Sequence, residues 1–316
     1  MVGFLSLLLS SFLTFVELNC ENLFDTQHDT LKSDQEFLPE STHHWTRTRY
    51  WRKLNNISKE ILSLGENGES WQLPSLVILC EVENDTVMRD LTKRSLLRNA
   101  HYEYFITDSP DLRGIDVALM YDPFVFRPLE HYSIRIPIIK DMRPTRDILY
   151  VKGVLGENDT LHVFGIHSPS RSGGEKASRP YRMHVQRYLA HAVDSIYINN
   201  GHANILIAGD FNDYTHSPAL DSLYTHGLVD VSAHSVGANG AKGTYRYHGD
   251  WGSLDHIVCS PATAARIDTC YIGDLPYLLE DDEKYGGVIP KRCYLGPCYL
   301  NGYSDHLPLV ARYRIE

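Results

Sequence analysis

The sequence lacks any pair of cysteines at Cys-x-x-Cys spacing, which argues against a zinc site or a thioredoxin-like redox site. The six cysteines among its 316 residues are Cys20, Cys80, Cys259, Cys270, Cys293 and Cys298. The first three lie in apolar, strand-like runs, so we expect them to be buried thiols. The last two flank Tyr-Leu-Gly-Pro, a turn signal, so a disulfide across a short hairpin is allowed but not required.

Positive charge is also scarce, since the formal net charge is −10. This excludes a protein that coats nucleic acid through a generally basic surface. An enzyme that docks a phosphodiester locally stays compatible with the balance, because a bound metal ion supplies positive charge where it is needed. Internal repeats and low-complexity segments are absent as well, and a composition of 43% hydrophobic and 22% charged residues is typical of a globular protein.

A long hydrophobic run is missing except near the N-terminus. Residues 1–13 are apolar with scattered serines and resemble the apolar part of an export signal, but no Lys or Arg precedes them. The run is too short to cross a bilayer unless the next strand is included, so we expect no transmembrane span. We take residues 1–12 as a leader or an extra strand. A leader implies a secreted or periplasmic protein, and a cytoplasmic protein is the alternative.

Short apolar runs bounded by turn signals predict many strands, and helical spacing predicts a few helices. Strands are expected at 13–18, 76–79, 102–106, 117–121, 148–155, 161–166, 205–208 and 309–313, with an edge strand around 134–138. Helices are expected at 45–64, from a cap at Asp85 onward, and at 180–199. Strands outnumber helices, and hairpins mix with helical crossovers. This pattern favours two sheets packed face to face with helices outside.

The most informative stretch is 205–213, where Ile-Leu-Ile-Ala reads as a buried strand that ends at Gly209. Asp210 and Asn212 follow, and both carry oxygen ligands of the kind that Mg²⁺ or Ca²⁺ prefers. Taken alone, the pair is also explained by a turn, because Asp and Asn hydrogen-bond their own backbone there. Glu81 is harder to explain in this way. An acid directly after Leu-Val-Ile-Leu-Cys is half buried, which is costly unless a cation or a donor meets it.

Other strand ends carry similar side chains. They are Asn19 with Glu21, then Glu81, His167, Asp255, and Asp305 with His306. The set is rich in oxygen and has only two histidines, so a hard cation fits it better than zinc. Histidines beside carboxylates are suited to proton transfer near neutral pH.

Six fragments in this order resemble the endonuclease/exonuclease/phosphatase superfamily. They are Leu-Asn-Cys-Glu-Asn, Cys-Glu-Val, His-Ser-Pro-Ser-Arg, Gly-Asp-Phe-Asn, Leu-Asp-His and Ser-Asp-His-Leu-Pro. The resemblance covers 13–315 and implies a single domain, residues 13–316, with a four-layered α/β sandwich of two mixed sheets between outer helices. It also implies metal-dependent hydrolysis of a phosphoester, with Mg²⁺ as the cofactor and Mn²⁺ or Ca²⁺ as alternatives.

The resemblance also implies roles for single residues. Glu81 looks like the main Mg²⁺ ligand, with Asn19, Glu21 and Asp305 completing or supporting the metal sphere. Asp210 matches the residue that orients or deprotonates the attacking water, and Asn212 the one that holds it. His306, with Asp255 as its partner, would bind a phosphate oxygen or act as an acid or base. His167 stands where apurinic endonucleases carry tyrosine, and it resembles a deoxyribonuclease histidine that protonates the leaving group.

Substrate contacts lie outside these fragments. Arg146 and Arg171 are candidates to bind flanking phosphates, since guanidinium groups match phosphate oxygens in pairs, and ordinary surface charges are the alternative. The leading hypothesis is a nuclease acting on nucleic acid, with no stable protein partner. A phosphatase or phospholipase-type phosphoesterase is the second hypothesis, and a non-catalytic binding protein the third. Residues 285–303 read as a hairpin or as the lining of a substrate groove.

Overall fold

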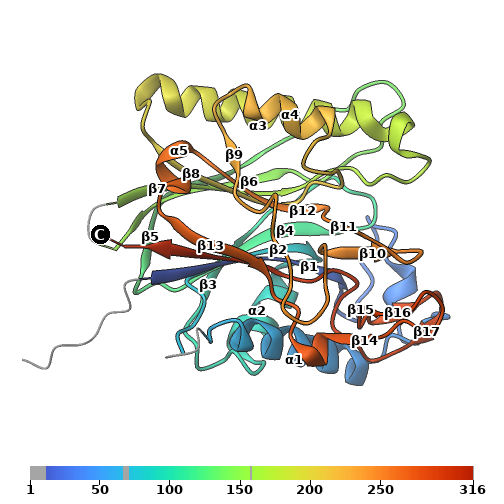
Figure 1. The fold of residues 1–316 in the computed structure, drawn as a ribbon. Coiled ribbons are helices and arrows are strands. Elements are labelled where there is room, and N and C mark those ends of the chain that lie inside the picture. The colour runs from blue at the N-terminus through green and yellow to red at the C-terminus, as the bar shows by residue number, and fades with distance from the viewer. Residues whose placement is uncertain (1–11, 67–70, 157–158, 316) are drawn as a thin grey trace, which may run out of the picture.

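Two six-stranded mixed sheets are stacked face to face, with helices on both outer faces, in the computed structural model, which describes residues 12–66, 71–156 and 159–315 (Figure 1). The first sheet has the order β13-β18-β1-β2-β4-β3 and the second the order β5-β6-β7-β8-β12-β9. This is the four-layered sandwich that the sequence predicts. Of residues 1–12, which are expected to form a leader or an extra strand, 1–11 lie outside the described part of the chain, and Phe12 is the first residue of β1.

The strands of the first sheet are β1 (Phe12–Leu23), β2 (Leu76–Val82), β3 (Glu103–Ile106), β4 (Asp116–Tyr121), β13 (Ile267–Ile272) and β18 (Leu309–Arg314). Those of the second are β5 (Phe126–Ile134), β6 (Ile148–Leu155), β7 (Asp159–His167), β8 (Asn204–Asp210), β9 (Val229–Asp230) and β12 (Asp255–Cys259). Each sheet has one parallel pair at its centre, β1 with β2 and β7 with β8. The carboxyl ends of these four strands supply most of the site described below.

The helices are α1 (Arg47–Ser63), α2 (Asp85–Lys93), α3 (Glu175–Asn199), α4 (Pro218–Tyr224) and α5 (Pro261–Ala264), with short 3₁₀ turns η1 (Gln35–Phe37) and η2 (Pro276–Leu278). Three small hairpins complete the described chain: β10 (Tyr245–Tyr247) with β11 (Asp250–Gly252), β14 (Leu279–Asp281) with β15 (Val288–Pro290), and β16 (Tyr294–Leu295) with β17 (Cys298–Tyr299). No helix in the described ranges is both long and apolar enough to cross a membrane.

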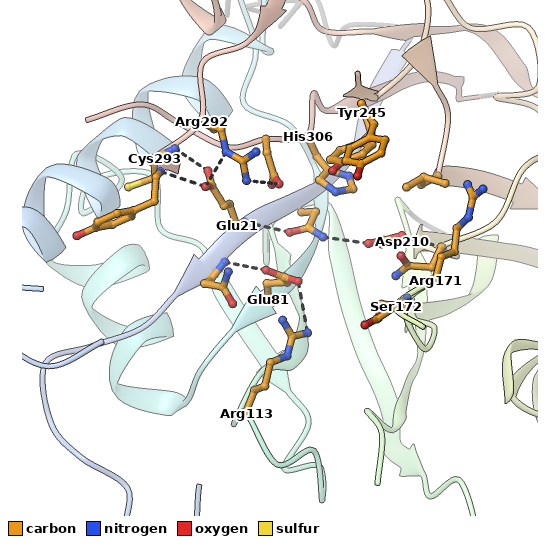
Figure 2. A pocket seen from close by; sticks show the side chains of 18 of the residues that line it. Glu21, Glu81, Arg113, Arg171, Ser172, Asp210, Tyr245, Arg292, Cys293 and His306 are labelled. Carbon is orange, nitrogen blue, oxygen red and sulfur yellow. Dashed lines mark hydrogen bonds and ion pairs between the residues drawn. The ribbon is translucent and has the colours of Figure 1, made fainter. Parts of the chain in front are cut away.

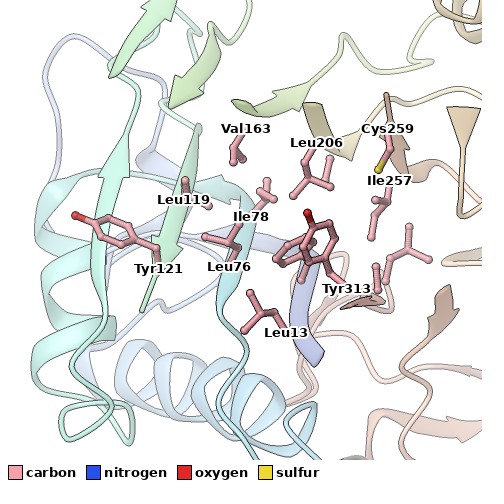
Figure 3. Close-up of a cluster of buried hydrophobic side chains, with 14 of the residues drawn as sticks. Leu13, Leu76, Ile78, Leu119, Tyr121, Val163, Leu206, Ile257, Cys259 and Tyr313 are labelled. Atoms are coloured by element: carbon pink, nitrogen blue, oxygen red, sulfur yellow. The ribbon is translucent and has the colours of Figure 1, made fainter. Parts of the chain in front are cut away.

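Alternation along the strands divides the core into layers. On β2, Leu76 and Ile78 face the second sheet and meet side chains such as Leu206, while Val77 and Leu79 point the other way and pack under α1 (Figure 3). Burying each such side chain contributes about 1.5–3 kcal/mol. The central strands therefore bury both faces, which explains why they read as continuous apolar runs.

Three local expectations are wrong in detail. Asn84, and not Asp85, caps α2, because its side chain accepts the backbone N–H of Val87. The edge strand ends at Ile134, so the stretch around 134–138 lies mostly beyond it. The long outer helix begins at Glu175 and continues through Pro180, where the sequence predicted its start.

The disulfide that the sequence allows is absent, because Cys293 and Cys298 are both free. In the hairpin of β16 and β17, Cys298 pairs with Leu295, and the carbonyl of Cys293 accepts the backbone N–H of Leu300. The two cysteines are therefore out of register. Cys20, Cys80 and Cys259 are buried thiols, as expected.

A buried ion pair joins β9 to β12. His256 Nδ1 lies 2.9 Å from an oxygen of Asp230, and His256 Nε2 lies 2.9 Å from the carbonyl oxygen of Asp213. Burial alone would lower the pKa of His256, but the hydrogen bond and charge of Asp230 raise it above the ordinary value. Both ring nitrogens face acceptors, so the imidazole is doubly protonated and charged.

We expect Asp230→Asn to destabilise the protein more at pH 6 than at pH 9. A raised folded-state pKa gives a stabilisation that is complete below the ordinary histidine pKa of 6.5 and is lost as pH rises through the folded-state value. The cost at pH 6 is about 2 kcal/mol, as for other hydrogen bonds to charged groups. Urea unfolding of both proteins at the two pH values measures it, and equal costs at both would contradict a charged His256.

Candidate active site

The predicted site residues gather at one edge of the sandwich, around a pocket of about 1240 Å³. Strands β1, β2, β7 and β8 all end there, and β12 begins beside them because it runs antiparallel to β8. His167, Asp210 and Asp255 stand in one row across the second sheet, since His167 pairs with Asp210 and Asp210 with Asp255. Nine of the eleven predicted residues line the pocket, namely Asn19, Glu21, Glu81, His167, Arg171, Asp210, Asn212, Asp305 and His306.

Bulges in the first sheet direct its acids into this pocket. The register of β1 against β2 shifts after Asn19, and that of β2 against β4 shifts between Cys80 and Val82. Glu21 and Glu81 have positive φ angles of 50° and 62° at these shifts. A bulge re-aims a side chain at the cost of local backbone strain. Glu81 is fixed further by the backbone N–H of Asn22, 2.9 Å from its Oε2.

Asp210 is held by donors from both sheets. The backbone N–H of Asn212 lies 2.8 Å from its Oδ1, and the side-chain amide of Asn19 donates to its Oδ2 at 3.1 Å (Figure 2). Burial and repulsion from Asp255 raise the pKa of Asp210 to about 7. A carboxylate with a pKa near the working pH is suited to accept a proton from water.

Gly209 precedes this aspartate and has a φ of +148°. A Cβ placed there would lie 1.8 Å from the carbonyl oxygen of Ile166 on the neighbouring strand. Only glycine fits, because any side chain would separate β7 from β8 at the point where His167 and Asp210 face each other.

Asp255 holds His306 in a buried pair. His306 Nδ1 lies 2.7 Å from Asp255 Oδ2, which also accepts a hydrogen bond from Thr244 at 2.5 Å. Burial alone would lower the pKa of His306, but the charge and hydrogen bond of Asp255 raise it well above the ordinary value. His306 is therefore a charged imidazolium that lines the pocket and can donate to an anionic oxygen.

His167 has the opposite protonation state. Burial and the positive charges of Arg146 and Arg113 lower its pKa well below the ordinary value. Its Nε2 lies 3.5 Å from Asp210 and 4.0 Å from Glu81. A neutral ring whose Nε2 faces two carboxylates is protonated on that nitrogen, so it presents an N–H group to them without adding charge.

Glu21 is engaged with the C-terminal hairpin. Its carboxylate accepts the backbone N–H groups of Cys293 at 2.6 Å and Tyr294 at 3.2 Å, and the buried Lys53 lies 3.8 Å away. Burial and the charge of Asp305 raise its pKa to about 7. Since its oxygens already have these donors, Glu21 anchors the hairpin to β1.

The two candidate arginines differ. Arg146 is buried and does not line the pocket, because it donates to the carbonyls of His167 and Ser168 and pairs with Asp111 at 3.1 Å. It fixes the loop after β7 and is therefore not placed to bind a phosphate in the pocket. Arg171 does line the pocket, with its guanidinium 4.4 Å from the ring centre of Tyr214.

Three charged residues of the site were missed by the sequence reasoning. Arg113 lies 3.6 Å from Glu81, and Arg292 bonds to Asp305 at 3.0 Å. Glu17 is fully buried beneath the pocket, and burial, Asp255 and Asp210 raise its pKa well above the ordinary value. A lone acid inside the apolar run of β1 was the available signal for Glu17. The sequence carries no such signal for Arg113 and Arg292, because their acidic partners are not their neighbours in the chain.

The donor set fits a divalent cation. Ligand-type atoms of Asp210, Asp255 and His306 all lie within 4.8 Å of one another. Because the His306 imidazolium has no free lone pair, the carboxylates are the candidate ligands. One oxygen of Asp255 is buried and has no hydrogen-bond partner among the described residues. Glu81 faces the same pocket, with one oxygen 3.6 Å from the half-exposed guanidinium of Arg113. Carboxylate oxygens with unfilled bonding capacity suit Mg²⁺, Mn²⁺ or Ca²⁺.

The sequence profile of the Endonuclease/Exonuclease/phosphatase family matches residues 14–314. A family member of that description from Bacteroides thetaiotaomicron has a similar structure, with a TM-score of 0.63 and 14% identity over 96% of this chain and 99% of that one. A truncated TDP2 from Caenorhabditis elegans has a TM-score of 0.59 and 15% identity over 96% and 98% of the two chains.

A mannosyl-6-phosphatase from Bacteroides thetaiotaomicron is also similar, with a TM-score of 0.61 and 15% identity over 95% of this chain and 98% of that one. No curated protein sequence matches. At these identities the structural matches show the shared fold, and the match to the family profile covers nearly all of the chain.

Proposed function

We propose that this chain, which belongs to the endonuclease/exonuclease/phosphatase family, hydrolyses a phosphoester at the described pocket. Family members are divalent-metal-dependent phosphoester hydrolases. The observation that carries the proposal is the meeting of Glu81, Asp210 and His306 in one pocket, with Asp255 bonded to His306 behind it, although these residues come from distant parts of the chain. A carboxylate able to take a proton, a fixed imidazolium and oxygen ligands for a cation are the parts that phosphoester hydrolysis needs.

Each residue then has a defined task. Asp210, held by Asn19 and Asn212, orients a water molecule and accepts its proton as the water oxygen bonds to phosphorus. The bond from phosphorus to the ester oxygen breaks, and the departing oxygen takes a proton from solvent. The His306 imidazolium donates to a non-bridging phosphoryl oxygen. A cation held by Glu81, with Asn19 and Asp305 nearby, would neutralise charge on the phosphoryl group.

The pocket favours a compact phosphoester over a nucleic-acid duplex. Seven of its lining residues are acids and three are arginines, and those arginines lie near acids. The acids are Glu21, Glu36, Glu81, Glu175, Asp210, Asp250 and Asp305, and the arginines are Arg113, Arg171 and Arg292. A duplex with a phosphate every few ångströms needs a basic surface beyond the reacting group. The phosphatase-type alternative to the nuclease hypothesis is therefore the one that this geometry supports.

A substrate panel tests the proposal. Purified protein is incubated with small phosphate esters, single-stranded DNA and plasmid, in Mg²⁺ and in EDTA. We expect phosphate release from the small esters in Mg²⁺, loss of that activity in EDTA, and recovery when Mg²⁺ is added back, while the plasmid stays intact. Cleavage of plasmid without attack on small esters would restore the nuclease hypothesis, and activity in EDTA would contradict the role of the cation.

A further inference from the structure

Four aromatic side chains form one wall of the pocket, away from the catalytic acids. This ring cluster consists of Phe37, His43, Trp45 and Tyr294, all of which line the pocket. Phe37, His43 and Tyr294 are partly exposed, and Trp45, which is 1% exposed, packs behind them. The ring of Tyr294 lies 4.7 Å from that of His43 and 5.9 Å from that of Trp45, and Phe37 meets Trp45 edge-on at 6.3 Å. Such spacings are those of a packed aromatic group.

The ring cluster is built in advance of any ligand. The hydroxyl of Tyr294 donates to the carbonyl of His43 at 2.9 Å, and the indole N–H of Trp45 donates to the carbonyl of Phe24 at 3.0 Å. Phe37 stacks on the buried ring of Phe24, with 4.1 Å between centroids. Because these rings are already fixed, a ligand that packs on them does not have to order them first.

A chain of hydrogen bonds connects the ring cluster to Asp210, the residue proposed to hold the attacking water. Asp210 bonds to Asn19, the oxygen of Asn19 accepts the N–H of Glu21, and the carboxylate of Glu21 accepts the N–H of Tyr294. Asn19 and Glu21 thus separate the hairpin from Asp210. Figure 2 shows the same order, with Cys293 beyond Glu21 at one side and Arg171 beside Asp210 at the other.

In-line displacement relates this order to the substrate. The attacking and leaving oxygens of a phosphoryl transfer lie on opposite sides of phosphorus. Since Asp210 holds the water, the leaving alcohol points away from Asp210, past Glu81 and Glu21, toward the ring cluster.

We propose that the ring cluster is the subsite for the leaving alcohol, and that it selects an alcohol whose ring has a flat apolar face, either an aryl ring or the apolar face of a pyranose. This inference rests on the proposed function for the direction of the leaving group. The binding it describes does not require turnover. The chemistry of the wall supports it, because aromatic faces stack on rings and gain little from a short open-chain alcohol.

Binding to the Asp210→Asn protein in Mg²⁺, measured by calorimetry, tests this subsite. Phenyl phosphate and a hexose phosphate represent the two ring types, and glycerol phosphate is the ringless comparison. We expect at least one ring-bearing ester to bind about tenfold more tightly than glycerol phosphate. In the same Asp210→Asn background, the further substitution Tyr294→Ala should remove this preference for ring-bearing esters. The control substitution Leu295→Ala in that background should keep the preference, because Leu295 is an exposed residue of the same hairpin that does not line the pocket.

Tyr294→Leu serves as a second variant that keeps apolar volume in the hairpin and removes the ring. Equal affinities for ring-bearing and ringless esters, or a preference that survives both Tyr294 variants, would overturn the subsite. The wild-type rate with glycerol phosphate in Mg²⁺ reports on the proposed function separately. Hydrolysis without ring preference rejects only the subsite, whereas ring-dependent binding without hydrolysis of any phosphoester rejects only the proposed function.

Discussion

Replacing Asp210 with asparagine is expected to lower kcat by about three orders of magnitude, within the range that a positioned general base contributes. Asparagine has nearly the same shape, so the loop and the pocket stay in place, but it cannot take the proton of the water. Burial and Asp255 disfavour the charged form of Asp210, as its raised pKa of about 7 shows. Removing that charge should therefore leave the thermal midpoint unchanged or slightly higher. Turnover of the best small ester and a melting curve measure both effects.

Asp250→Asn is the matched control, because Asp250 is an exposed acid at the same pocket. We expect its kcat to stay within a few-fold of the wild type. If the acids in the pocket acted only through their negative charge, the Asp210→Asn and Asp250→Asn variants would lose kcat to the same extent. An Asp210→Asn protein with nearly wild-type kcat would show that another group accepts the proton.

His306→Ala should have the second-largest effect, a loss of about two to three orders of magnitude in kcat, because the fixed imidazolium no longer meets the phosphoryl charge. It should also cost about 3 kcal/mol of stability, since Asp255 is left buried with its cationic partner removed. Activity is measured at a temperature well below the melting point of the variant, and stability by urea unfolding.

The double variant Asp255→Asn/His306→Ala separates the two effects. It should be more stable than His306→Ala alone, because the unpaired carboxylate is gone, and no more active. A double variant that is less stable than His306→Ala would mean that Asp255 is stabilised mainly by Thr244 and not by the imidazolium.

The sequence predicts the parts of the site that depend on local pattern. Asp210 and Glu81 follow short buried strands, and an acid in that position needs a reason to be there. The stacking of two sheets follows in the same way from strands that are apolar on both faces. The family resemblance then supplies the roles that no single fragment carries, as for His306 with Asp255.

Contacts between remote segments are what the sequence does not reveal. Arg146 reads as a phosphate ligand, yet in the folded chain it is enclosed by backbone carbonyls after β7. Glu21 reads as a metal ligand, yet its oxygens meet N–H groups of the C-terminal hairpin. Their side-chain directions depend on bulges and loop paths, and local propensity does not encode these.

The hydrogen bond from Asn19 to Asp210 spans the seam between the two stacked layers. Neither layer contains a working centre by itself, so the alignment of the reacting groups depends on how the layers rest on each other. A small slide of one layer would separate Asp210, the proposed base, from Glu81, the proposed cation ligand, while both layers kept their backbone ladders. Enzymatic competence is thus a more sensitive gauge of interlayer packing than the content of strands and helices.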